Sequence, residues 1–115
     1  MKKVTLTCAH AIVKYLIAQK ILIDGKKEPL FPGVFGIFGH GNVACLGQAL
    51  EENQKDLPTY RGHHEQNMAL TGIGYARGKR RQQIFIATSS VGPGATNMVT
   101  AAAVAMSNRL PILFL

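Results

Sequence analysis

The chain has 115 residues, enough for one domain, and its 47% hydrophobic and 17% charged residues exclude a disordered polymer. The net charge of +7 could attract a polyanion, but much of the excess lies in Arg77–Arg81 without interleaved aromatic residues, so we expect no nucleic-acid groove. No apolar run reaches the roughly 18 residues of a membrane span, and Cys8 and Cys45 form no CxxC motif, so we expect a reducing, cytoplasmic setting and no membrane.

Hydrophobic spacing predicts the elements in chain order. A helix begins after Thr7, a plausible N-cap, and the polar stretch that starts at Asp24-Gly25 is expected to be a loop. Strand, turn and helix then alternate, with strands over 34–38, 59–61 and 84–88, helices over 43–53, 64–77 and 94–108, and a final apolar run over 110–115. This pattern predicts an α/β fold, with a parallel sheet covered by helices on both faces.

The final apolar run, Leu110–Leu115, raises the question of completeness. A parallel strand is normally buried on both faces, and nothing in the sequence covers this one. We therefore expect residues 1–115 to be an apparently truncated, N-terminal part of a domain, with exposed sheet surface that favours self-association.

Glu65 is the first candidate site residue. It begins a helix whose same face carries the small residues Ala69, Gly72 and Ala76, which would let a flat ligand or another backbone lie close. An acid in the first turn of a helix is often only favourable to the helix dipole. If Glu65 is buried, however, desolvation raises its pKa and makes it a proton donor near neutral pH. The sequence leaves both interpretations open.

The second candidate is the turn Gly92-Pro93-Gly94, followed by Thr96 and Asn97. Glycines permit close backbone approach, and a helix N-terminus can hold an anion. The turn lacks the Gly-Lys-Ser/Thr ending of a phosphate-binding P-loop, so a tight structural connection is the simpler interpretation.

A third candidate, Gly39–Ala44, fits the GxGxxA pattern of a dinucleotide site between a strand and a helix. Such a site also needs an acid at the end of the next strand, where this chain has Arg61. The pattern thus allows an NADP-binding Rossmann oxidoreductase. His40, within the same turn, is either a neutral turn residue or a group that contacts a polar substrate.

Taken together, three segments resemble the pyrimidine-binding domain of thiamine-diphosphate enzymes: Phe35–Gly39, His64–Gln66 with Gly74–Arg77, and Thr88–Asn97. The segment Phe38–Asn42, Phe-Gly-His-Gly-Asn, is most similar to a branch of that family that hydrolyses a carbon–carbon bond of a cyclic diketone in inositol catabolism.

The resemblance implies roles for particular residues. Glu65 would be catalytic and cofactor-binding, with its carboxyl group hydrogen-bonded to the aminopyrimidine N1′ of thiamine diphosphate. Gly92, Pro93 and Asn97 would shape the neighbouring wall of the cofactor site. His40 and Asn42 would face the substrate.

The resemblance also implies what this chain lacks. Members of the family hold the diphosphate through Mg²⁺ on a second domain with a Gly-Asp-Gly…Asn pattern, which is absent from this sequence. That domain belongs to a neighbouring subunit, so we expect a homo-oligomer and a fragment that is inactive alone. A non-enzymatic assembly module, whose small-residue helices pack against a partner, is the remaining alternative.

Overall fold

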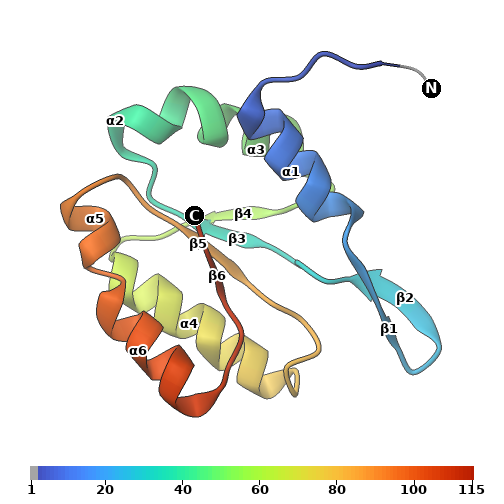
Figure 1. Cartoon of the computed structure of the whole chain (residues 1–115), viewed down its shortest axis with the longest axis vertical. Helices are drawn as coiled ribbons and strands as arrows, with labels where there is room; N and C mark the ends of the chain where they lie inside the picture. Colours follow the sequence, from blue (N-terminus) through green and yellow to red (C-terminus); the bar gives the residue numbers. More distant parts are fainter. Residues whose placement is uncertain (1–2) are drawn as a thin grey trace.

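A computed structural model describes residues 3–115 as a four-stranded parallel sheet between two layers of helices (Figure 1). The elements are α1 (Cys8–Ala18), β1 (Lys20–Ile23), β2 (Lys26–Pro29), β3 (Val34–Gly36), α2 (Gly39–Asn42), the π-helical turn η1 (Val43–Gly47), α3 (Gln48–Glu52), β4 (Thr59–Arg61), α4 (Glu65–Gly78), β5 (Ile86–Thr88), α5 (Pro93–Thr96), α6 (Val99–Asn108) and β6 (Leu113–Phe114). The predicted α/β class is confirmed, with helices on both faces of the sheet.

Two apolar clusters hold the layers together, one on each face of the sheet. The same strand contributes to both clusters because its successive side chains point to opposite faces. Ile86 packs with α1, η1 and α3, whereas its neighbour Ala87 packs with α4 and α6. Both residues of this central strand are fully buried. Near-continuous apolar strands of this kind are typical of a parallel sheet covered on both sides.

The strand order fixes where a ligand would bind. The sheet runs β4-β3-β5-β6, and all of its pairings are parallel. The chain therefore leaves β3 toward one neighbour, β4, and later crosses to the other neighbour, β5. In doubly wound sheets the crevice at such a switch point, beyond the carboxyl ends of the strands, is the usual ligand site. In the Rossmann order the first strand pairs with the second and the fourth strand of the sheet. Here the first strand, β3, pairs with the second, β4, and the third, β5, so the strand order does not favour the dinucleotide interpretation of Gly39–Ala44.

The expected loop around Asp24-Gly25 is wrong, because the chain forms an antiparallel hairpin of β1 and β2 there. Asp24 and Gly25 connect the strands with φ of +48° and +79°. Two positive φ angles are typical of the tight turns that match the twist of a hairpin, and Asp-Gly is a preferred sequence for them. The dipeptide was therefore the signal for this hairpin.

Two predicted helices are interrupted in the structure. The helix expected over 43–53 begins earlier, at Gly39, and passes through the π-helical turn η1 before α3. The helix expected over 94–108 divides into α5 and α6. At Met98 the backbone N–H bonds the carbonyl of Ala95, three residues back, which tightens the chain between the two helices.

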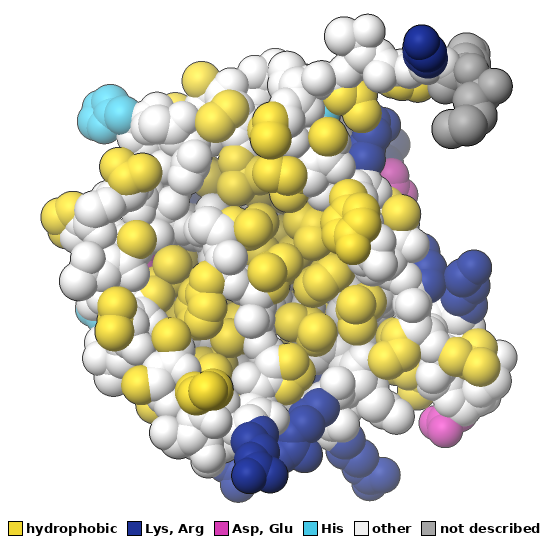
Figure 2. All heavy atoms as spheres, in the orientation of Figure 1, with side chains coloured by type: hydrophobic (Ala, Val, Ile, Leu, Met, Phe, Trp, Pro, Cys, Tyr) yellow, Lys and Arg dark blue, Asp and Glu magenta, His cyan; other side chains and the backbone are white. Residues whose placement is uncertain are grey.

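The last strand, β6, forms one edge of the sheet and pairs with β5. Its residues Leu113 and Phe114 are half-buried, and hydrophobic side chains are visible around it in Figure 2. An apolar sheet edge of this kind is a surface on which further chain or a partner can pack.

Thr88, at the end of β5, is fully buried, and within residues 3–115 its hydroxyl has no hydrogen-bond partner. An unsatisfied buried hydroxyl costs about 1–3 kcal/mol, so we expect Thr88→Val to raise the free energy of unfolding by about 1 kcal/mol. Urea unfolding measures the change. Thr88→Ser is the control, because it keeps the hydroxyl and loses a methyl group, and it should be destabilising. A less stable valine variant would show that the hydroxyl has a partner.

Candidate functional site

The turns that follow β3 and β5 meet at the carboxyl edge of the sheet. Gly39, with φ of +60°, lies so close to Ser90 that an added Cβ would be 2.5 Å from the Ser90 Cβ. The side-chain amide of Asn42 donates a hydrogen bond to the backbone carbonyl of Ser89 at 2.9 Å. These contacts fix the walls of the switch-point crevice relative to each other.

Glu65 reaches the same edge from α4. His64 caps this helix, because its backbone is extended and its Nδ1 accepts a hydrogen bond from the Asn67 N–H at 3.3 Å. Glu65 is therefore the first residue of α4, directly beyond β4. Its Oε2 accepts a hydrogen bond from the Asn97 side-chain amide at 2.8 Å. The structure thus brings together two candidate residues that are 32 positions apart in the sequence.

The sequence left open whether burial raises the pKa of Glu65. In the structure this pKa is lowered. The hydrogen bond from Asn97 holds the pKa of Glu65 below its ordinary value of 4.5, with further help from the Glu65 backbone N–H and from His64. Partial burial acts in the opposite direction and is the weaker influence. The half-buried carboxyl group is therefore an anion at neutral pH.

An open cavity of about 920 Å³ lies in front of this pair, lined by Glu65, Gly92, Pro93, Gly94, Thr96 and Asn97. Glu65, Gly92, Pro93 and Asn97, the residues assigned to the cofactor by resemblance, all belong to this lining; their roles stay predictions. Gly94 and Thr96 were not among the predicted cofactor residues. The Gly-Pro-Gly turn was the signal for both, because it places them on the same wall.

The Gly92-Pro93-Gly94 turn depends on its glycines in two ways. Gly92 has φ of +67° and ψ of −121°, a conformation that side-chain-bearing residues rarely adopt. Gly94 is needed for space, because an added Cβ would lie 2.5 Å from Ser90 Oγ and 3.2 Å from Glu65 Oε1. The turn therefore leaves the cavity open beside the carboxylate.

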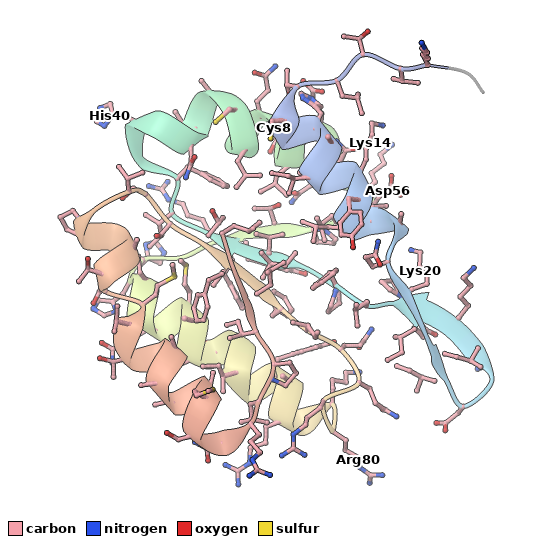
Figure 3. The ribbon with its side chains drawn as sticks, in the orientation of Figure 1. Cys8, Lys14, Lys20, His40, Asp56 and Arg80 are labelled. Atoms are coloured by element: carbon pink, nitrogen blue, oxygen red, sulfur yellow. The ribbon has the colours of Figure 1, made fainter. Side chains whose placement is uncertain are left out.

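His40 and Asn42 do not line this cavity. His40 is exposed at the tip of α2 and points outward (Figure 3). The amide of Asn42 is engaged with the backbone of Ser89. In this structure Asn42 braces the crevice wall, and the substrate-facing role of both residues stays a prediction.

The small residues of α4 face the protein itself. Ala69 and Ala76 are fully buried. At Gly72, an added Cβ would lie 3.1 Å from Ile112 and 3.2 Å from Phe85. Small side chains therefore let α4 pack closely on the sheet, which sets the position of Glu65 at the helix start.

The remaining surface features lie elsewhere. The basic segment Arg77–Arg81 spans the end of α4 and the turn before β5, so it lies at the amino edge of the sheet, opposite the cavity. Figure 3 labels Arg80 at this end, and Figure 2 shows basic side chains there. Within residues 3–115 no group of three or more His, Cys, Asp or Glu side chains is placed to hold a metal ion. None of the described helices is both long and apolar enough to cross a membrane.

The fold is that of a known class of protein. Residues 7–115 match the family described as thiamine pyrophosphate enzyme, N-terminal TPP binding domain, and the chain belongs to this family. The family resemblance predicted from the sequence is thereby confirmed.

Particular relatives within the family are similar over the whole chain. The 3D-(3,5/4)-trihydroxycyclohexane-1,2-dione hydrolase of Geobacillus thermodenitrificans (strain NG80-2) is 53% identical over 115 residues, which are 100% of this chain and 18% of the relative. The proteins of the same name from Clostridium tetani (strain Massachusetts / E88) and Listeria innocua serovar 6a are 50% and 49% identical, over 100% and 99% of this chain. The chain spans about a fifth of the length of these curated relatives, 18% in each case.

Proposed function

We propose that the chain is the N-terminal, pyrimidine-binding part of a thiamine-diphosphate-dependent hydrolase that opens the ring of trihydroxycyclohexane-1,2-dione by carbon–carbon cleavage in inositol catabolism. The observation that carries the proposal is the pairing of Glu65 with Asn97 in a cavity at the switch point of a sheet that belongs to this enzyme family. Relatives that are 49–53% identical and carry this hydrolase name support the choice of reaction.

The residues present fit the pyrimidine end of thiamine diphosphate. The cavity of about 920 Å³ is ample for an aromatic ring. Two of its lining residues, Gly92 and Gly94, present no side chain to a bound ring. No side chain of the described residues donates a hydrogen bond to Glu65 Oε1, which leaves this oxygen available to a ring nitrogen.

When bound, thiamine diphosphate supplies the nucleophilic carbon for attack on a substrate carbonyl. Glu65 would hold and return a proton at a ring nitrogen of the cofactor. Covering the open cavity would remove water from Glu65 and raise its pKa from the lowered value of this chain, which favours the protonated form. Gly92 and Pro93 would orient the ring against the carboxyl group.

We further propose that Mg²⁺ and the diphosphate are held by a second domain outside residues 1–115, contributed by a neighbouring subunit of a homo-oligomer. The exposed cavity beside Glu65 and the apolar edge strand β6 are two surfaces that a partner could cover, which supports this assembly. A cytoplasmic location would suit the two free cysteines, Cys8 and Cys45.

Cofactor dependence tests the proposed function. Full-length protein, stripped of cofactor and treated with a chelator, is expected to lose ring-opening activity on trihydroxycyclohexane-1,2-dione and to regain it with thiamine diphosphate and Mg²⁺. Residues 1–115 alone should show no turnover. Activity that persists without the cofactor would contradict the proposal. Tight NADP binding would instead favour an oxidoreductase, and a captured partner without any catalysis would favour an assembly module.

A further inference from the structure

We propose that Asn97 is a positioning residue that assigns different tasks to the two oxygens of Glu65: it holds Oε2 and leaves Oε1 as the oxygen that carries the proton. This role presupposes the proposed function, because the partner of Oε1 would be the pyrimidine ring. Asn97 itself needs no contact with the cofactor to act in this way.

The direction of the hydrogen bond carries the assignment. Asn97 Nδ2 is a donor, and it lies 2.8 Å from Glu65 Oε2. An oxygen that already accepts this N–H cannot also carry a proton directed at the same nitrogen. In a protonated carboxyl group the carbonyl oxygen is the better hydrogen-bond acceptor, so the amide on Oε2 favours the carbonyl form of Oε2 and places the proton on Oε1. The pair thus distinguishes two otherwise equivalent oxygens.

Space at Oε1 comes from the neighbouring turn. Oε1 lies 3.2 Å from the position that a Cβ of residue 94 would occupy, and Gly94 lines the cavity. Any side chain at position 94 would therefore crowd the oxygen. Glycine at this position keeps Oε1 open toward the space in which a ring would lie.

The same turn also fixes Asn97. The Asn97 N–H bonds the carbonyl of Pro93 at 3.0 Å, and the Thr96 N–H and hydroxyl both bond the carbonyl of Gly92, at 2.9 and 3.0 Å. These bonds anchor the short helix α5 to its own start. The Gly-Pro-Gly turn and Glu65 therefore form one unit, in which the turn orients the amide and the amide orients the acid.

Carboxyl ¹³C NMR titration of Glu65 in the 115-residue chain tests the hydrogen bond directly, with no cofactor present. In Asn97→Ala the pKa of Glu65 should rise toward 4.5, because the donor that stabilises the anion is lost. In Asn97→Asp it should rise further, because two carboxylates would share one site. Asn67→Ala, in the same turn of α4, is the matched control and should leave the titration unchanged. An unchanged pKa in Asn97→Ala would overturn the proposal.

Exchange of the cofactor's C2 proton for deuterium in the full-length protein, with thiamine diphosphate and Mg²⁺, tests the functional consequence. Asn97→Ala should slow exchange roughly tenfold to a hundredfold, as expected for a misplaced proton-transfer group. The same substitution in a Glu65→Gln background should have little further effect, since no carboxyl group is left to position. Equal losses in both backgrounds would show that Asn97 acts independently of Glu65 and would overturn the proposal. If the wild type shows no cofactor-dependent exchange, the proposed function fails, while the titration still decides whether Asn97 holds Glu65.

Discussion

Replacement of Glu65 by Gln is expected to lower the turnover of the full-length protein about 10²- to 10⁴-fold, the usual contribution of a positioned proton-transfer group. Glutamine has nearly the same shape and can still accept the hydrogen bond from Asn97, but it cannot exchange a proton with a ring nitrogen. The fold should be unaffected, because the side chain is only half-buried. The measurement is kcat at saturating thiamine diphosphate and Mg²⁺, together with thermal unfolding followed by circular dichroism.

Glu51→Gln provides the comparison for this experiment. Glu51 is an exposed carboxylate of α3, so its substitution removes the same charge and should leave turnover near that of the wild type. Near-normal turnover in Glu65→Gln would exclude a proton relay through this residue. A large loss of thermal stability would show that Glu65 is mainly structural.

Gly39→Ala is expected to lower the free energy of unfolding by about 2–5 kcal/mol. The backbone has φ of +60°, where a side chain costs about 1–2 kcal/mol. The new Cβ would also lie 2.5 Å from the Ser90 Cβ, and relief of such an overlap costs about 1–3 kcal/mol. Because these turns form the walls of the crevice, binding of thiamine diphosphate should weaken as well. Urea unfolding and a cofactor titration measure the two effects.

Gly41, two residues later, is the matched control. It lies in α2, and no neighbouring heavy atom would come within 4 Å of an added Cβ. Gly41→Ala should therefore be neutral or stabilising by up to about 1 kcal/mol, since alanine favours the helix. Adding Ser90→Gly to Gly39→Ala should recover the overlap part of the loss. If Gly39→Ala is as stable as Gly41→Ala, the two turns do not pack as described.

Much of the fold could be predicted because local signals and long-range packing agree. The helix expected over 64–77 is observed at Glu65–Gly78 with His64 as its cap, and the strand expected over 59–61 is observed at Thr59–Arg61. Thr7 caps α1 as expected, accepting a hydrogen bond from the His10 N–H. For α1 and α4 the spacing of apolar residues matches the face that the helix buries.

The structure differs from the sequence predictions where backbone geometry, and not hydrophobicity, determines the conformation. The β1–β2 hairpin depends on two positive φ angles at Asp24 and Gly25. The division between α5 and α6 depends on a change of hydrogen-bond pattern at Met98, within an uninterrupted run of helix-compatible residues. Periodicity contains no information on either feature.

The sequence indicated which residues gather at the candidate site, but it did not indicate the pKa of Glu65. Glu65, Gly92, Pro93 and Asn97 gather around one cavity, as the order of strands and turns indicates. The lowered pKa of Glu65 depends on a contact with Asn97 across 32 residues, which no local pattern reveals. The amide of Asn42 bonds Ser89, a pairing that depends on how two separate turns approach each other.

A crystal structure of the full-length protein with thiamine diphosphate and Mg²⁺ would show whether Glu65 contacts the pyrimidine ring. We expect Glu65 Oε1 within hydrogen-bond distance of the pyrimidine N1′, with Oε2 still bonded to the Asn97 amide. A cofactor bound elsewhere, or a Glu65 carboxyl group left in bulk solvent in the assembled oligomer, would contradict the account.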